Sequence, residues 1–450
     1  MKVLIIGGVA AGTKTAAKLK REDRSIEVTV ITKDQDISYA GCGLPYYVGG
    51  FIESREELIV NTPQKYSGLT GVEVRTGKEA VALDAAKKEV TLKDVRTGNT
   101  ETWPYDKLVI ATGASAAELP IEGKDLPGVF RMRTPDDAED MRTYAEINHV
   151  KKAVVIGAGF IGLEAAENLH ARGIQVTVID FAPQVLPNIL DPEMADYVKN
   201  HLLNAGIRVI TGTSAKQIQG TDKVTGVETS EGTLSCEMLI MAAGIRPNTA
   251  FLEGTGIEMF KGTILVDSQM KTSLDDVYAA GDCAMVTTRI TGKRQWSPMG
   301  SSANLEGRTL AQVLAGAQKT YPGVLGTGVV KLPGLNAGRT GLTEAQAREA
   351  GYDVETVLVP TDDKAHYYPD ASFLITKLIA DWKTRKLLGV QVLGPGEVDK
   401  MVDIAVMGIN MGAVLEDFEN ADFAYAPPFS TAIHPVSYTH LRAHETLRHL

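Results

Sequence analysis

One cysteine of the chain lies where a reactive thiol is expected. Cys42 is flanked by Gly41 and Gly43 and stands just before residues 44–47, which resemble the start of a helix. Flanking glycines let another group approach the backbone closely, and the amides at a helix start lower the pKa of a nearby thiol. The resulting thiolate would be a good nucleophile. We therefore predict a catalytic Cys42, against the alternative of a small buried residue, the usual role of a free cysteine.

A second cysteine at the spacing of a dithiol site is missing. Tyr47 occupies the position five residues after Cys42, and the other two cysteines are Cys236, in an apolar segment, and Cys283, beside Asp282. Both of these are expected to be packing residues. The predicted chemistry is therefore that of one thiol, which either forms a mixed disulfide with its substrate or cycles through an oxidised sulfur.

Two segments, residues 3–32 and residues 153–180, repeat one plan about 150 residues apart: an apolar strand, a glycine-rich turn, an amphipathic helix and a β-branched strand. This plan is typical of the βαβ dinucleotide-binding unit. Each unit must place its turn at the carboxyl end of a parallel strand, where a helix N-terminus can bind a pyrophosphate. The sequence thus predicts two dinucleotide sites.

The second unit fits the pattern in full and predicts a nicotinamide cofactor site. Asp180 ends its return strand, where a carboxylate accepts hydrogen bonds from a ribose diol and repels a 2′-phosphate, so NADH is expected over NADPH. The residues expected to contact this cofactor are Gly157, Gly159, Phe160, Ile161, Gly162, Asp180 and Gly244.

The first unit departs from the pattern, because Val9 occupies the middle glycine position and Thr32, not an acid, ends the return strand. The late segment Gly281-Asp282 compensates, since an aspartate at a strand end opposite the turn is well placed for the ribityl hydroxyls of a flavin. A helix N-cap is the alternative role of Asp282. The residues expected to contact FAD are Gly7, Gly8, Val9, Ala10, Ala11, Gly12, Thr32, Lys33, Ala111, Thr112, Gly113, Gly281 and Asp282.

The order of the elements predicts an α/β fold with two Rossmann-like dinucleotide-binding domains and a C-terminal α+β dimerisation domain. An apolar strand at residues 277–280 follows the second unit, so we expect the chain to return to its first domain. The expected boundaries are 1–112 with 246–322 for FAD, 113–245 for NAD(H), 325–435 for dimerisation and 436–450 for a disordered or non-native tail. In that tail, His440 and His444 stand at helical spacing, which leaves a metal site as an alternative.

Composition excludes several classes of function. The formal net charge is −10 with acidic and basic residues interleaved, so no nucleic-acid partner is expected. No apolar run approaches the roughly 18 residues of a membrane span, and the apolar N-terminus is too short for a signal peptide. The cysteines do not pair as metal ligands, so no metal is predicted. We expect a cytoplasmic protein.

Taken together, these motifs resemble the single-cysteine branch of the pyridine nucleotide-disulfide oxidoreductases over about residues 1–435, most closely coenzyme A disulfide reductases and NADH-dependent persulfide reductases. The resemblance implies a homodimer in which electrons pass from NADH through FAD to Cys42. Oxidases and peroxidases of this branch carry a histidine in the first glycine turn, where this chain has Ala10. The segments around Tyr367 and Tyr425 match those that place two tyrosines of the partner subunit beside the substrate sulfur; aromatic packing at the interface is the alternative.

Recognition of coenzyme A is implied by fewer residues. Arg21 and Ser38 match family contacts for this substrate, and Lys14 and Lys18 add positive charge, although scattered lysines are also typical of a solvated helix face. The leading hypothesis is an enzyme that reduces a low-molecular-weight disulfide or persulfide, with coenzyme A disulfide as the best candidate substrate. The alternatives are an NADH oxidase or peroxidase and, from another class, a flavin-containing redox sensor.

Overall fold

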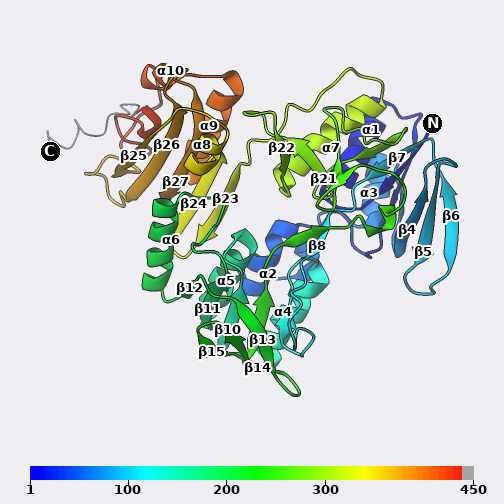
Figure 1. The fold of residues 1–450 in the computed structure, drawn as a ribbon, viewed down its shortest axis with the longest axis horizontal. Helices are drawn as coiled ribbons and strands as arrows, with labels where there is room; N and C mark the ends of the chain where they lie inside the picture. Colours follow the sequence, from blue (N-terminus) through cyan, green and yellow to red (C-terminus); the bar gives the residue numbers. More distant parts are fainter. Residues whose placement is uncertain (438–450) are drawn as a thin grey trace.

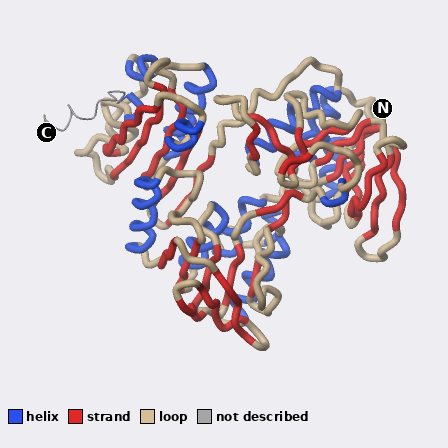
Figure 2. Tube along the Cα trace, viewed as in Figure 1, coloured by secondary structure: helices blue, strands red, loops and turns tan. Residues whose placement is uncertain are grey.

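Two parallel sheets and one antiparallel sheet form the three bodies of the molecule (Figures 1 and 2). The structure, a computed structural model, describes residues 1–437. The predicted fold class is confirmed, since two Rossmann-like sheets precede a C-terminal α+β body. The proposed histidine pair of the tail lies outside the described residues. Within residues 1–437, no helix has the length and apolar character needed to cross a membrane.

The first sheet holds the N-terminal glycine turn, between β1 and α1 (Ala10–Glu22), and all of its strands are parallel. Its strands, in spatial order, are β20 (Val277–Ala279), β7 (Lys107–Ile110), β1 (Lys2–Ile6), β2 (Glu27–Ile31) and β3 (Glu73–Arg75). Helices α1 and α7 (Gly300–Leu314) pack against each other. The central strands are buried, as parallel strands covered by helices must be. Strand β20 therefore lies beside β7 although more than a third of the chain separates them in sequence.

The second sheet repeats the arrangement around the turn between β10 and α5 (Phe160–Ala171). Its strands, in spatial order, are β12 (Arg208–Thr211), β11 (Gln175–Asp180), β10 (Lys152–Ile156), β16 (Met238–Met241) and β9 (Val129–Phe130). Helices α4 (Pro135–Ile147) and α6 (Pro192–Asn204) belong to the same body. A short antiparallel pair, β8 (Ala114–Ala116) with β17 (Ile245–Pro247), carries the chain out of the first body and back into it.

Smaller sheets and helices complete these two bodies. They comprise β4 (Lys78–Asp84), β5 (Glu89–Asp94) and β6 (Thr100–Pro104); β13 (Ala215–Gly220), β14 (Val224–Thr229) and β15 (Gly232–Ser235); β18 (Met259–Phe260), β19 (Thr263–Leu265), β21 (Ala284–Thr287) and β22 (Arg294–Trp296); and the helices η1 (Gly41–Gly43), α2 (Leu44–Gly49), η2 (Arg55–Leu58), α3 (Pro63–Thr70) and η3 (Ala250–Leu252).

The C-terminal body is an antiparallel sheet with α9 (Val398–Met411) packed on β24 and β27. Its strands, in spatial order, are β23 (Gly328–Leu332), β24 (Leu335–Gly341), β27 (Leu387–Gly394), β26 (Phe373–Asp381) and β25 (Val354–Asp362), and its remaining helices are α8 (Glu344–Glu349), α10 (Leu415–Glu419) and η4 (Pro435–Ser437). Met407 and Met411 of α9 are 60% and 79% exposed, so this helix keeps an apolar face that residues 1–437 do not cover.

A buried lysine joins the C-terminal body to the second sheet. Lys377 of β26 is 2% exposed, and its ammonium lies 2.9 Å from Asp191, 2.5 Å from Glu193 and 2.9 Å from Glu344. Gln391 also donates a hydrogen bond of 2.7 Å to Asp191. A buried ammonium is tolerated only when such partners surround it. This cluster therefore fixes how α6 meets the sheet of the C-terminal body.

Candidate active site

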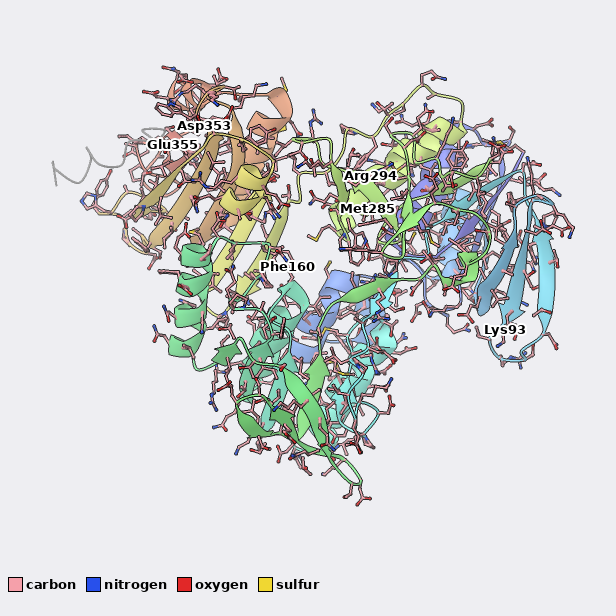
Figure 3. The ribbon with its side chains drawn as sticks, in the orientation of Figure 1. Lys93, Phe160, Met285, Arg294, Asp353 and Glu355 are labelled. Atoms are coloured by element: carbon pink, nitrogen blue, oxygen red, sulfur yellow. The ribbon has the colours of Figure 1, made fainter. Side chains whose placement is uncertain are left out.

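A cleft of about 1590 Å³ runs between the three bodies. It is larger than the roughly 300–1,000 Å³ of a usual small-molecule pocket, and both glycine turns line it. Phe160 of α5 and Arg294 of β22, both labelled in Figure 3, line it from different bodies. The cleft is therefore large enough for two extended cofactors that meet end to end.

Most residues predicted from the sequence to bind cofactor converge on this cleft. Those that line it are Gly7, Gly8, Val9, Ala10, Ala11, Thr32, Lys33, Ala111, Thr112, Gly113, Gly159, Phe160, Ile161, Gly244, Gly281 and Asp282, together with Cys42. Gly12, Gly157, Gly162 and Asp180 are not among the lining residues. The three glycines are buried beneath the turns, whereas Asp180 is half-buried at the end of β11.

Backbone packing explains the glycines of the first turn. Gly7 has φ +121°, and a Cβ there would lie 2.0 Å from the oxygen of Ala111. A Cβ on Gly12 would lie 1.9 Å from the oxygen of Gly7. Helix α1 begins at Ala10, and Val9, its N-cap, supplies no side-chain cap. The first amides of α1 thus have no side-chain acceptor and face the cleft, a fit for the pyrophosphate of FAD.

The second turn has the same construction with a carboxylate added. A Cβ on Gly162 would lie 1.9 Å from the oxygen of Gly157, whereas a Cβ on Gly159 would meet no atom within 4 Å. Asp180 accepts hydrogen bonds of 2.6 Å from the amide of Ala158 and 2.7 Å from the amide of Ala182. These bonds hold the carboxylate at the end of β11, next to the N-terminus of α5, which fits a nicotinamide dinucleotide.

Cys42 lies in η1 and is the cysteine open to the cleft. Cys236 and Cys283 are 2% and 0% exposed, so both are packing residues. Partial burial, with the charges of Glu164 and Asp282, raises the pKa of the Cys42 thiol, although Arg133 acts in the opposite direction. The prediction that helix amides lower this pKa is therefore wrong for the protein alone, because burial of the thiol and the charges of two carboxylates raise it.

Glu164 is a site residue that sequence reasoning missed. It lies on α5, one turn after Phe160, lines the cleft and interacts with Cys42 and Tyr46. Burial, reinforced by the charge of Glu167, raises the pKa of Glu164 to about 7, although its hydrogen bond with Tyr46 opposes the rise. Its spacing of four residues from Phe160, on the same helix face, was the available signal. The arrangement places a carboxyl that can hold a proton at neutral pH beside the thiol.

Asp282 lies in the cleft wall between β20 and β21. Its carboxylate accepts a 2.6 Å hydrogen bond from Arg133, and its backbone oxygen accepts one of 2.8 Å from Trp296. No helix begins there, because β21 follows, so the N-cap alternative is wrong. The amide of Gly281 donates a 2.7 Å bond to the buried Glu306, which fixes the turn that presents Asp282. Arg133 is a second residue that the sequence analysis missed.

The residues predicted to bind substrate lie outside the lining of the cleft. Lys14, Lys18 and Arg21 lie along α1, and Lys18 forms a 2.5 Å ion pair with Glu22. Ser38 is joined to the first turn, since its amide donates a 2.8 Å hydrogen bond to the oxygen of Gly8. The three basic residues therefore lie on the helix that follows the first glycine turn, and Ser38 is hydrogen-bonded to the backbone of that turn.

Tyr367 and Tyr425 come together on the C-terminal body. Their hydroxyl oxygens are 3.2 Å apart, and the two side chains are 64% and 48% exposed. They are not among the residues that line the cleft with Cys42. If they act on the substrate, they must do so in the cleft of a second copy of the chain.

Family models and relatives agree with this geometry. Residues 1–303 match the pyridine nucleotide-disulphide oxidoreductase model, and residues 329–436 match the dimerisation domain of the same enzymes. The chain belongs to this family. It is an oxidoreductase that uses FAD and NAD(P)H, as the two glycine turns indicate.

Two named proteins and one solved structure are similar to the chain over at least 97% of its length. The chain is 36% identical to an NADH oxidase of Methanocaldococcus jannaschii over 100% of this chain and 99% of that one. It is 37% identical to the NAD(P)H sulfur oxidoreductase (CoA-dependent) of Pyrococcus furiosus over 97% of each. Among solved structures, the NAD-dependent persulfide reductase from A. fulgidus matches with a TM-score of 0.94 and 38% identity, covering 100% of this chain and 84% of that chain.

Proposed function

We propose that this enzyme uses Cys42 to reduce a low-molecular-weight disulfide or persulfide with electrons from NADH, and that coenzyme A disulfide is its substrate. The observation that carries the proposal is the position of Cys42, the one exposed thiol of the chain, in a cleft that both dinucleotide turns line. The other two cysteines are buried, and neither lines the cleft with Cys42.

The chemistry follows from a single nucleophile. The thiolate of Cys42 attacks one sulfur of the substrate, the substrate S–S bond breaks, and one thiol leaves and takes up a proton. Cys42 is then part of a mixed disulfide, which two electrons from NADH cleave to release the second thiol and restore the thiolate. FAD, when bound, accepts the hydride of NADH and passes on the electron pair. One disulfide and one NADH with a proton thus give two thiols and NAD⁺.

Protons are supplied by groups of this chain. Glu164, with its pKa raised to about 7 mainly by burial, holds a proton beside Cys42 at neutral pH. The hydroxyls of the partner subunit's Tyr367 and the partner subunit's Tyr425 stabilise the leaving thiolate. This role requires a homodimer, which the dimerisation-domain match and the exposed apolar face of α9 support.

Coenzyme A is favoured as the thiol by charge and by a relative. Lys14, Lys18 and Arg21 form a cationic edge on α1 that can meet its phosphates, and Ser38 adjoins the same turn. The name of the Pyrococcus furiosus relative includes dependence on coenzyme A. A persulfide of coenzyme A carries the same phosphates and would meet the same residues.

Replacing Cys42 tests the proposal. Cys42→Ser removes the nucleophile and leaves both turns intact, so coenzyme A disulfide turnover should fall by about a thousandfold or more, while NADH still reduces the flavin. Cys236→Ala, at a buried thiol, is the matched control and should turn over like the wild type. Undiminished disulfide reduction by Cys42→Ser would overturn the proposal.

An NADH oxidase is the second candidate function, favoured by the 36% identity to the Methanocaldococcus jannaschii enzyme. Oxygen uptake measured beside NADH consumption, with coenzyme A disulfide, its persulfide and glutathione disulfide as competing acceptors, separates the two functions. A redox sensor, in contrast, would react once with peroxide and show no rapid multiple turnover with any of these acceptors.

A further inference from the structure

The helix that follows Cys42 is held by an arginine of another body. Nη1 of Arg142, on α4, donates hydrogen bonds to the backbone oxygens of Tyr47 (3.3 Å), Ile52 (3.3 Å) and Glu53 (3.0 Å). The guanidinium also lies 4.7 Å from the centre of the Tyr47 ring. One side chain of the second sheet's body thus holds the end of α2 and the turn after it.

A second arginine completes this contact. Arg172, at the C-cap of α5, donates a 3.0 Å hydrogen bond from Nη1 to the oxygen of Val48 and a 2.8 Å bond from Nη2 to Glu146. Glu146 also accepts a 3.3 Å bond from Nε of Arg142. We call Arg142, Glu146 and Arg172 the α2 clamp.

Helix α2 is held by its apolar packing and by this clamp. It has six residues, fewer than an isolated helix needs to persist, so it relies on such contacts; Leu44, Tyr47 and Val48 are buried against the second body, and the clamp binds the polar end of the helix. Its last carbonyls carry partial negative charge, which the cations of Arg142 and Arg172 offset. Cys42 precedes α2 by two residues, so the direction of its thiol follows the direction of this helix.

We propose that the α2 clamp positions Cys42, so that the body that binds NADH sets the geometry of the thiol that receives its electrons. This inference rests on the proposed function, because it assumes that Cys42 is the reacting thiol. Arg142, Glu146 and Arg172 are positioning residues, since none of them is among the residues that line the cleft. Helix α5, which Arg172 ends, begins at the second glycine turn, so one rigid helix runs from the cofactor turn to the clamp.

The chain offers a matched control in Arg55. This residue also joins the first body to α4, through ion pairs with Asp36, Asp136 and Glu139, but none of these reaches α2. The side chains of Arg55, Arg142 and Arg172 are 24%, 24% and 23% exposed. Loss of Arg55 therefore removes a similar interdomain cation without releasing the carbonyls of α2.

The experiment compares Arg142→Met, Arg172→Met and Arg55→Met in the flavin-loaded enzyme, after reduction and removal of excess reductant. Iodoacetamide reports on Cys42, because the other two cysteines are buried. The clamp variants should change the alkylation rate of Cys42 severalfold and lower kcat with coenzyme A disulfide by about tenfold, with flavin reduction by NADH within about twofold of wild type. Arg55→Met should match the wild type in all three. Arg142→Lys should recover only part of the loss, since an ammonium replaces Nη1 but neither the Nε bond to Glu146 nor the planar contact with the Tyr47 ring.

The outcomes separate the two ideas. If the clamp variants resemble Arg55→Met in alkylation rate and kcat, the clamp does not position Cys42. If Cys42→Ser keeps full disulfide turnover, the proposed function fails, whatever the clamp variants do. Should Arg142→Met not fold, Glu146→Gln tests the same point, because it unlinks the two arginines at an exposed position. It should shift thiol reactivity in the same direction by a smaller factor, and an unchanged alkylation rate would contradict the clamp.

Discussion

The two βαβ units share their backbone and differ in the source of their carboxylate. Gly7 and Gly157 have φ of +121° and +114°, and a Cβ on Gly12 or Gly162 would come equally close, 1.9 Å, to a backbone oxygen. In the second unit, Asp180 of its own return strand lies at the turn. In the first unit, the return strand ends without an acid, and Asp282 arrives from a strand late in the chain.

The comparison teaches which glycines belong to the fold and which to the ligand. The first and third glycines of each turn are fixed by contact with backbone oxygens, so they would be required without a cofactor. The middle position is not fixed in this way, because Val9 occupies it in one unit and Gly159, with open space around it, in the other. Function should therefore respond to the middle position and to the carboxylate, and stability to the outer glycines.

Replacing an outer glycine should have the largest effect. Gly162→Ala drives a Cβ into the oxygen of Gly157, and the shift of backbone that this forces should cost about 3 kcal/mol of folding free energy. Gly159→Ala meets no atom, so its thermal midpoint should stay at the wild-type value while KM for NADH rises. Equal loss of stability in both variants, measured by thermal unfolding, would break the distinction.

Removing the carboxylate of Asp282 should have the second-largest effect. Asp282→Ala leaves Arg133 without its partner in the cleft wall and removes the acceptor proposed for the ribityl chain. The variant should purify with most of its FAD lost, as judged by the ratio of flavin to protein absorbance. A variant that keeps its full flavin content and its wild-type thermal midpoint would show that Asp282 does not hold FAD.

The carboxylate of the second unit should have a smaller effect, confined to the choice of cofactor. Asp180→Asn keeps an acceptor for the amide of Ala158, loses the bond from the amide of Ala182 and removes the charge that repels a 2′-phosphate. The ratio of kcat/KM for NADPH to that for NADH should rise by about tenfold, or about 1.4 kcal/mol. Asp196→Asn, at an exposed acid of α6, is the control. A wild-type enzyme that already prefers NADPH would show that this role of Asp180 is wrong.

The sequence predicts the two βαβ units because the residues that define each unit lie close together in the chain. A strand, a turn and a helix were expected in residues 3–32 and again in residues 153–180, and β1 with α1 and β10 with α5 are found there. The glycine spacing likewise predicted both turns, since strand, turn and helix follow one another in the chain. The surroundings of Cys42 were not predictable in this way. Glu164 comes from the second body and Asp282 from a late segment of the first, and burial together with their charges raises the pKa of the thiol instead of lowering it.

The other contacts that the sequence did not predict join residues that lie far apart in the chain. Arg133 meets Asp282 across 149 positions, and Lys377 of a strand meets Asp191 at a helix start. Neither periodicity nor a short motif encodes such a pair, because each partner alone reads as an ordinary surface charge. Tyr367 and Tyr425 differ from these pairs, because the resemblance of their segments to the family already named them together, and their hydroxyl oxygens are 3.2 Å apart.

The smallest expected effect is on the pH dependence of stability. It comes from Glu306, which holds the turn that presents Asp282. Burial raises the pKa of Glu306 to about 7, above its unfolded value, so the folded protein binds this proton more tightly. The resulting stability is fully present below the unfolded pKa and is lost as pH rises to about 7.

Glu306→Gln keeps an acceptor for the amide of Gly281 but cannot ionise. Between about pH 5.5 and about pH 8, its thermal midpoint should therefore fall by a few degrees less than that of the wild type. Glu231→Gln, at an exposed turn, should follow the wild type. If all three proteins lose the same number of degrees, Glu306 is already ionised at low pH, and its bond to Gly281 is that of a carboxylate.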